Sequence, residues 1–574
     1  MIPFHEEISE YVWNMKYRKP NETTMEKTWG RIAKAAAMAE KKEVRTNWQK
    51  AFYDILEGFL FLPGGRIIAG AGIKKNVTLF NCFVMPILED SLHGIFDALK
   101  EAALTLQQGG GVGYDFSILR PSGLPAKHVG AVASGPISFM RIWNAMCATM
   151  LSTGARRGAM MGILRCDHPD IEAFIQAKAN PRELRHFNLS VLVTDAFMQA
   201  VENDDDWDLT FACDDHSGTL RTVKARALWE KIMQSAYDYA EPGVIFEDTI
   251  NRNNNLWYRE KITATNPCGE IPLPPYGACN LGSVNLTQFV QEPFTENAQI
   301  NWEKLTKVTC IATRFLDNVI DVSRYPLKVQ KQESLGTRRI GLGVTGLANV
   351  FVMCGLRYGA KDSLELAARI MKTIADATWR TSIELAKERG SFPYLQKNKY
   401  LEGYFVQQLP NDLRSAIDHQ GIRNSHHNAI APTGTISLLA NNVSNGIEPI
   451  FSANYQRKVR MENGELKTFS VNDYALVEWR KSNPNTEPPA WTDAQSLKPM
   501  DHLRMQAAIQ PYVDHAISKT INLPENFPFS ELAEVYTEAF KMGLKGCTIY
   551  RPNAITGSVL THSDSQDLDR CCTE

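Results

Sequence analysis

The sequence predicts an α/β fold, in which short buried strands alternate with amphipathic helices. Helical patterns such as 92–106 and 362–389 carry apolar residues at helical spacing. Short apolar segments stand between such patterns, and 336–344, which begins with a glycine, is typical of a buried strand. This alternation is that of an α/β layer or barrel. The length of 574 residues is compatible with a barrel, because barrels often form one long domain.

The N-terminal residues 1–60 are expected to form a helical segment, with a strong helix-forming run at 35–42. A turn at 62–66, a strand that contains Cys82 and a helix capped at 90–91 are expected next. That helix stops at the glycines 109–111. These glycines either end the helix or let a ligand approach the backbone closely. A second apolar helix is expected at 136–151.

Two loops rich in glycine, arginine and small polar residues follow this helix. One is 152–159, which contains Arg156 and Arg157, and the other is 178–187, which contains Arg182 and Arg185. Each suits either a mobile loop that contacts phosphate and base or a solvated basic loop. The acidic run at 203–206 is expected to be an exposed turn.

The C-terminal half continues the alternation of helices and strands. Helices are expected at 362–389, 502–519 and 529–542, a surface excursion at 480–500 and a final strand within 543–551. The polar tail from about residue 556 has the composition of a disordered segment. We therefore expect a helical segment at 1–60, a catalytic domain at 61–555 and a flexible tail at 556–574.

Composition excludes several classes of protein. The formal net charge of −2 argues against a nucleic-acid binder, which would show a basic excess. No apolar run is long enough to span a bilayer, and the N-terminus lacks the order of a secretory signal, so we expect a cytoplasmic protein. The 11 cysteines include no CxxC pair and no Cys/His cluster, so neither a disulfide scaffold nor a metal site is predicted.

The segment 266–270 is the most informative part of the chain. In an extended backbone alternate side chains point the same way, so Asn266, Cys268 and Glu270 would address one small molecule together. An amide, a thiol and a carboxylate form an active-site set. The alternative is a Pro/Gly turn in which Cys268 is an ordinary buried thiol. A second thiol, Cys279, follows within 276–281.

A Thr/Gly-rich turn that opens a helix stands at 431–437. Unsatisfied amides and the helix dipole make such a turn a ready site for phosphate, although it also suits a plain capped helix. The nearby segment 445–449 favours the phosphate site.

Five segments, in this order, resemble those of the ribonucleotide reductase catalytic subunit. They are 78–84, 266–270, 431–437, 445–449 and 543–551, and the similarity extends over roughly residues 50–555. The resemblance implies a ten-stranded α/β barrel of the ribonucleotide reductase and glycyl radical enzyme type, with 266–270 as its central finger loop. Too little chain precedes the first motif for the family's ATP-binding cone, so no overall activity switch is expected.

The resemblance also implies the roles of individual residues. Cys268 matches the thiyl radical site, Glu270 the general base, Asn266 the amide that binds the ribose hydroxyls, and Cys82 and Cys279 the reducing dithiol. The implied substrate-binding residues are Asn81, Gly110, Gly111, Pro432, Thr433, Gly434, Thr435 and Ile436. Cys571 and Cys572 match the redox relay of the tail, although adjacent cysteines pair only in a strained ring, so one acts alone or pairs with another subunit's tail.

Partners follow from the same resemblance. They are a ribonucleotide substrate, a dNTP or ATP effector that the loops 152–159 and 178–187 read, a thioredoxin- or glutaredoxin-like reductant, and a second copy in a homodimer. No nucleic acid and no membrane are expected.

The radical source is predicted from what the final strand contains. Family members that use a metal-bearing subunit carry two consecutive tyrosines here, whereas this chain has Ile549 and Tyr550. No glycyl-radical element is present near the C-terminus either. The segments resemble most the class II enzymes, which implies adenosylcobalamin as cofactor and, on overall likeness, diphosphate substrates. No Asp-x-His-x-x-Gly motif appears, so no protein ligand to cobalt is expected.

Three alternatives remain. One is a class I large subunit that needs a separate metal-radical small subunit. A second is a nucleotide-binding regulator, which would need neither the thiols nor the base. A third is a thiol–disulfide oxidoreductase, which would not use a phosphate loop.

Overall fold

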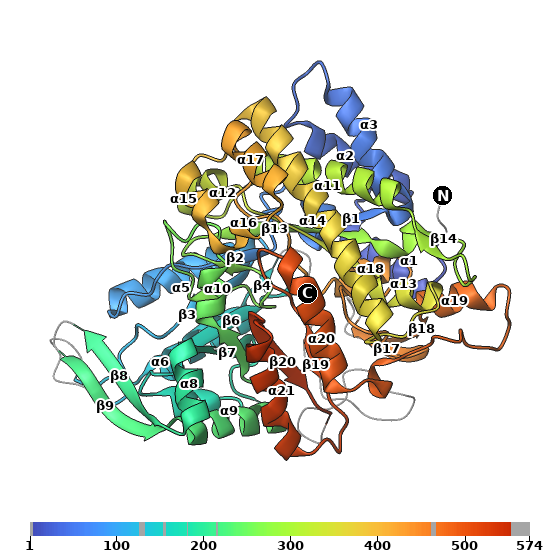
Figure 1. Ribbon diagram of the computed structural model, residues 1–574. Coiled ribbons are helices and arrows are strands. Elements are labelled where there is room, and N and C mark those ends of the chain that lie inside the picture. The colour runs from blue at the N-terminus through green and yellow to red at the C-terminus, as the bar shows by residue number, and fades with distance from the viewer. Residues whose placement is uncertain are drawn as a thin grey trace.

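The computed structural model describes residues 4–125, 132–152, 156–180, 182–213, 216–460 and 466–552. They form one large mixed sheet of 10 strands with helices packed around it (Figure 1). The α/β fold and the number of strands predicted for the chain are therefore confirmed.

One half of the sheet comes from the first half of the chain. Its neighbouring strands run parallel and in sequence order, namely β2 (Cys82–Val84), β3 (Gly111–Asp115), β6 (Met160–Arg165), β7 (Phe187–Val193) and β10 (Gly243–Phe246). The helices α5 (Leu92–Gln107), α6 (Pro136–Thr149) and α9 (Ala225–Tyr239) connect them. The Ser91 hydroxyl caps α5 as predicted, because it accepts a hydrogen bond of 3.1 Å from the Gly94 amide.

The second half of the sheet runs antiparallel to the first. Its strands are β13 (Ala278–Asn285), β16 (Ile340–Thr345), β19 (Thr520–Asn522) and β20 (Gly546–Tyr550). The tenth strand of the sheet, β1 (Phe61–Pro63), pairs antiparallel with β13. At one boundary β13 pairs with β2, and at the other β20 pairs with β10. Residues 426–430 complete this half, because Asn428 pairs with Leu342 of β16 and Ile430 pairs with Ile517, which leads into β19. The strands thus form a ring.

A short hairpin occupies the interior of this ring. It consists of β11 (Ala264–Thr265) and β12 (Pro272–Leu273), which pair antiparallel. Apolar side chains of the hairpin and of the surrounding strands form one buried cluster, which includes Val84, Met161, Ile163, Leu192, Ile245, Ala264, Ile271, Leu273 and Leu281. The burial of this apolar surface holds the hairpin inside the sheet.

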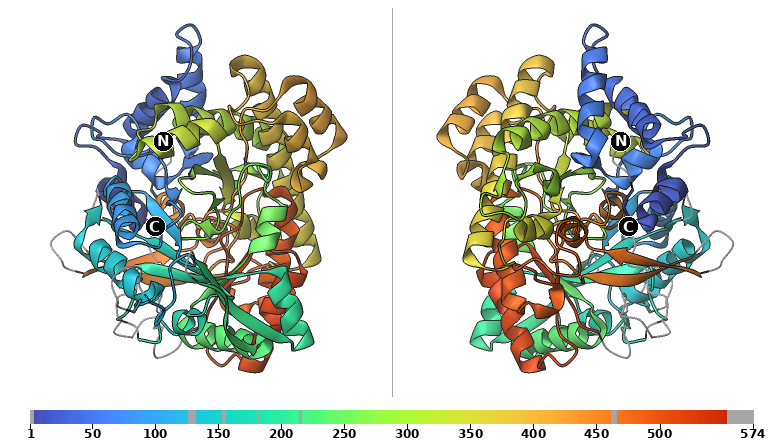
Figure 2. Two further views of the ribbon diagram at one scale, coloured as in Figure 1. Left: turned by 90° about the vertical axis from the view of Figure 1, so that its left-hand side faces the viewer. Right: turned by 90° about the vertical axis from the view of Figure 1, so that its right-hand side faces the viewer.

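The N-terminal segment is helical, with α1 (Glu7–Val12), α2 (Met25–Ala37) and α3 (Arg45–Leu56). Helix α1 packs against α18 (Gly434–Leu439), whereas α2 and α3 pack together against α11 (Trp302–Val322) and rise at the top of both views of Figure 2. Glu40 anchors them to the sheet domain, since it accepts hydrogen bonds from Arg314 and Asn318 and pairs with Arg389. Burial raises the pKa of Glu40, but these hydrogen bonds outweigh it and hold the pKa at about 2.

Three predicted boundaries were wrong. The helix at 35–42 ends at Ala37, and Arg45 donates to the carbonyls of Met38 and Glu40 beyond it. The buried strand begins at Ile340, because Gly336 still belongs to the helix α12 (Lys328–Thr337). The helix expected at 502–519 ends at Ile509, two residues before a proline, which disfavours continued helix.

The remaining helices pack around the sheet (Figure 1). Further helices are α4 (Gly65–Gly70), α12 (Lys328–Thr337), α13 (Leu347–Met353), α14 (Lys361–Arg389), α18 (Gly434–Leu439), α19 (Tyr474–Arg480), α20 (Pro499–Ile509) and α21 (Phe529–Lys541). A hairpin of β8 (Asp206–Cys213) and β9 (His216–Lys224) projects at the lower left of Figure 1. Within the described ranges, none of the helices combines the length and apolar character that crossing a membrane requires.

Candidate active site

The loop between β11 and β12 is a tight turn and not the extended segment predicted for 266–270. The Gly269 amide donates to the Asn266 carbonyl at 3.1 Å, and Gly269 has a φ of +83°. Pro267 fixes its own φ and Gly269 accepts a left-handed one, so the chain reverses here. Cys268 is therefore exposed at the tip, while Asn266 and Glu270 are buried at the base.

Glycines of β3 make room for this turn. A Cβ at Gly113 would lie 1.8 Å from the Thr265 carbonyl oxygen, and one at Gly111 would lie 3.0 Å from Pro267. The Asn188 side chain holds the turn from β7, since its Nδ2 donates to the Pro267 carbonyl at 2.8 Å. Gly110 instead faces the ring of Phe83, which would lie 2.6 Å from an added Cβ, so glycine is needed there for packing.

Cys82 lies against the base of the turn. Asn266 Nδ2 donates to Cys82 Sγ at 3.2 Å, and Cys82 Sγ in turn donates to Glu270 Oε1 at 3.8 Å. The Glu270 main chain is also fixed, because its carbonyl accepts from the Ala516 amide at 2.9 Å. Three predicted site residues, Cys82, Asn266 and Glu270, are thus in contact.

Cys279 is the register partner of Cys82 in the antiparallel pair β13–β2. The sheet therefore brings together two thiols that are far apart in the sequence. Burial raises the pKa of Cys82 well above its ordinary value, and the negative charge of Glu270 adds to the effect. Burial likewise raises the pKa of Cys279. Both side chains are protonated thiols at neutral pH, the form that can give up hydrogen and electrons.

Behind Cys279 lies a buried polar group that the sequence did not indicate. His515 Nε2 is 3.9 Å from Cys279 Sγ, and the Lys545 ammonium donates to the carbonyls of Asp514 and His515. Burial lowers the pKa of His515 to about 3 and that of Lys545 to about 7. Residues 514–515 were expected to be helical, whereas they follow an irregular path, and the His515 amide donates to the Asn428 carbonyl. Of these residues, only Lys545 lies in a segment that resembles the family, namely 543–551.

The Thr/Gly-rich turn does open a helix, α18, as predicted. Thr433 precedes it with a φ of +58°, and the Thr433 hydroxyl accepts from the Gly446 amide at 2.8 Å. Ser437 donates to Asn445. The segments 431–437 and 445–449 are therefore bonded to each other. Pro432 and Gly434 are half-buried, whereas Thr435 and Ile436 are buried.

Asn81 immediately precedes β2. Its carbonyl accepts from the Gly111 amide at 2.8 Å. Its side-chain oxygen Oδ1 is buried and, within the described residues, has no hydrogen-bond partner. An acceptor in that state suits a ligand that brings a hydroxyl.

The predicted loop and tail residues are less fully described. Arg156 and Arg157 form β5, which pairs with β4 (Leu151–Ser152), but the description does not extend to their side chains. The Arg182 amide donates to Asn180, and Arg185 makes contacts of its own. Cys571 and Cys572 lie outside the described residues.

Comparison with known proteins covers nearly the whole chain. Residues 80–550 match the family model of the ribonucleotide reductase barrel domain, and residues 4–76 match that of the ribonucleotide reductase all-alpha domain. The vitamin B12-dependent ribonucleoside-diphosphate reductase of Mycobacterium tuberculosis is 37% identical over 97% of this chain and 78% of that protein. The protein of the same name from Thermoplasma acidophilum is 37% identical over 89% of this chain and 66% of that protein. The ribonucleoside-diphosphate reductase subunit alpha of Chlamydia pneumoniae is 26% identical over 92% of this chain and 56% of that protein.

Proposed function

This chain belongs to the ribonucleotide reductase family, and we propose that it reduces ribonucleoside diphosphates to 2′-deoxyribonucleoside diphosphates with adenosylcobalamin as its cofactor. The names of its relatives at 37% identity support both the substrate and the cofactor. The single tyrosine in β20, Tyr550, supports the same class.

One observation carries the proposal. The exposed Cys268 stands at the tip of a turn whose base holds Asn266 and Glu270 against Cys82, with Cys279 in register beside Cys82. A radical sulfur, a carboxylate base and a dithiol are the groups that this reduction requires.

We assign the steps to these groups as follows. The Cys268 thiyl radical takes hydrogen from C3′ of the ribose, and Glu270 accepts the proton of the 3′-hydroxyl. Cys82 and Cys279 supply two hydrogens, one with which the 2′-hydroxyl leaves as water and one that replaces it at C2′, and they become a disulfide. Cys268 then returns hydrogen to C3′, and Glu270 returns the proton to the 3′-oxygen. The raised pKa values of Cys82 and Cys279 suit the formation of the disulfide, because both sulfurs start as protonated thiols that can give up hydrogen.

Adenosylcobalamin fits what the site contains. When bound, it supplies the carbon radical that removes hydrogen from a thiol. That chemistry requires a thiol that the cofactor can reach. Cys268 meets this requirement, because it is the one exposed cysteine among the described residues. A separate metal-bearing subunit would require a path for the radical to Cys268, and the chain offers no pair of consecutive tyrosines in β20 for it.

Substrate phosphates are proposed to bind at Pro432, Thr433, Gly434, Thr435 and Ile436, and the ribose near Asn81, Gly110 and Gly111. The Asn81 Oδ1 atom supports this placement, since it lacks a partner within the described residues. Effector recognition by the loops at 152–159 and 178–187, a homodimer and a thioredoxin- or glutaredoxin-like reductant acting through Cys571 and Cys572 stay predictions. So do the domain boundaries at 60 and 555 and a cytoplasmic location.

Anaerobic incubation of the purified protein with CDP, a dithiol and adenosylcobalamin tests the proposal. We expect dCDP to form without any second protein. The variant Cys268→Ser should lose this activity, while Cys213→Ser, in the projecting hairpin β8–β9, should keep it. Activity that appears only with an iron- or manganese-loaded partner would refute the cofactor assignment, and an active Cys268→Ser variant would refute the site.

A further inference from the structure

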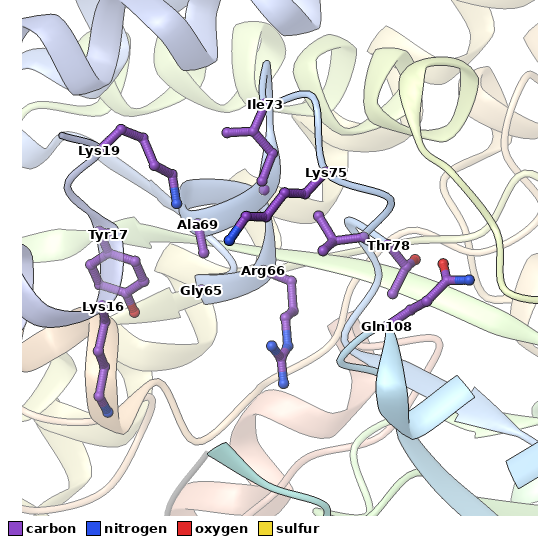
Figure 3. Close-up of a pocket in the computed structure, with 12 residues that line it drawn as sticks. Lys16, Tyr17, Lys19, Gly65, Arg66, Ala69, Ile73, Lys75, Thr78 and Gln108 are labelled. Carbon is purple, nitrogen blue, oxygen red and sulfur yellow. The ribbon is translucent and has the colours of Figure 1, made fainter. Parts of the chain in front are cut away.

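A basic pocket lies between the N-terminal helical segment and the strand that carries Cys82. One wall comes from Lys16 to Lys19, and the opposite wall comes from α4 and from the approach to β2, which contains Lys75 and Thr78 (Figure 3). Gln108, at the end of α5, lies on a third side. The cavity has a volume of about 140 Å³.

The lining is strongly cationic. Lys16, Lys19, Arg66 and Lys75 all contribute to it, and none of the residues that line it is acidic. Lys16 and Arg66 have interaction partners of their own. Among the described residues, neither the Lys19 nor the Lys75 amine forms an ion pair. In Figure 3 both amines point into the same space.

The two amines repel each other where they stand. Burial lowers the pKa of Lys19, and the charges of Arg31 and Lys75 lower it further. The negative charge of Glu22 raises the pKa of Lys19 in part, although the Glu22 oxygens also accept hydrogen bonds from Arg31, Thr28 and the Lys19 amide. An anion between Lys19 and Lys75 would remove this repulsion.

The pocket also offers a hydrogen-bond acceptor. Gln108 Oε1 is buried and lacks a partner in the described part of the chain. The negative oxygens of a phosphate-type anion would pair with the lysine amines. The cavity volume of about 140 Å³ admits such a group and is smaller than the roughly 300 Å³ or more of pockets that enclose a whole small-molecule ligand.

We propose that this pocket binds a phosphate-type anion of diphosphate size at a site separate from the phosphate loop 432–436. The two sites share no lining residue. The pocket borders both segments that flank the active cluster, since Thr78 leads to Cys82 and Gln108 leads to Gly111, whose amide bonds the Asn81 carbonyl. A bound anion would therefore stabilise residues 78–82, the segment that positions Cys82.

Calorimetric titration with inorganic diphosphate tests the site. The full-length protein is first saturated with CDP, without adenosylcobalamin, so that the substrate phosphate loop is occupied. We expect one further equivalent of diphosphate to bind, more weakly at higher ionic strength. Lys19→Met and Lys75→Met should each weaken binding by about tenfold, the loss expected for one charge-assisted hydrogen bond.

Lys50→Met is the matched control, because Lys50 is exposed on α3 and paired with Asp54. It should bind diphosphate as the unaltered protein does. Absence of binding, equal weakening by all three substitutions, or displacement of diphosphate by CDP would each overturn the proposal. CDP binding is measured in its own titration, and CDP reduction is measured in the dCDP assay. Failure of the proposed function is therefore distinguished from failure of the diphosphate site.

Discussion

Asn266 connects the turn to the dithiol. Its Oδ1 accepts from the Ile271 amide at 2.9 Å and from the Thr265 hydroxyl at 3.2 Å, while its Nδ2 donates to Cys82. The sequence assigned this amide to the substrate alone. The contacts indicate a second role, because the same side chain holds both the base of the turn and Cys82, one of the two thiols that we propose as reductant.

Asp473 is a carboxyl with a pH-dependent effect on stability. It caps α19 and accepts two hydrogen bonds from Asn349 Nδ2. Burial raises its pKa to about 7, against the hydrogen bonds that lower it. The folded protein therefore keeps a proton that the unfolded chain has already lost, so this contribution to stability is present below about pH 4 and disappears as the pH rises through 7.

We predict that Asp473→Asn reduces the difference in thermal midpoint between pH 5 and pH 8, since an asparagine still caps the helix but does not titrate. Thermal melts of both proteins at the two pH values measure it. Asp362→Asn, at the exposed start of α14, serves as control and should leave the difference unchanged. An undiminished difference in Asp473→Asn would show that another group governs this pH range.

At the scale of elements, periodic segments were the predictable ones. The pattern at 362–389 lies within one residue of α14, and the cap and glycine stop of α5 are confirmed. The finger turn could not be predicted in the same way. Its shape depends on the positive φ of Gly269 and on contact with β3, which is distant in the sequence.

Gly113→Ala should displace the finger hairpin, because the added methyl group would coincide with the Thr265 carbonyl. We expect a lower thermal midpoint from overpacking and a fall in dCDP formation of about a hundredfold, as ångström-scale misplacement of a reacting group produces. Gly30→Ala is the control. It lies in α2 with nothing within 4 Å of an added Cβ, so it should be neutral or slightly stabilising. Full activity in Gly113→Ala would contradict the seating of the hairpin.

At the scale of the whole molecule, closure of the ring brings the site together. No local pattern places Cys82 beside Cys279, and only the family resemblance implied that they act as a pair. The strand register now sets them opposite each other. The group around His515 was missed for the same reason, since its position depends on the strand-like path of 513–519 between β20 and residues 426–430.

Oxidation of this pair should stabilise the fold. A disulfide between Cys82 and Cys279 would close a long loop in the unfolded chain, worth about 5 kcal/mol in the chain-entropy account. We expect the oxidised protein to melt several degrees above the reduced one. The comparison is made by thermal melts before and after removal of dithiol, with thiols counted in each sample.

Cys279→Ser should abolish this difference, whereas Cys354→Ser, at the end of α13, should preserve it. Equal melting of the oxidised and reduced forms, with the thiol count showing the bond present, would contradict the long-loop argument.

The exposure of Cys268 has a consequence when alkylating agents or peroxides are present. Of the nine cysteines in the described residues, it is the exposed one. The same accessibility that admits a sugar also admits alkylating agents and peroxides, and burial shields Cys82 and Cys279 from them. Such reagents should therefore modify Cys268 first, and if Cys268 is the radical site that we propose, a modified molecule would lose activity while it stays folded.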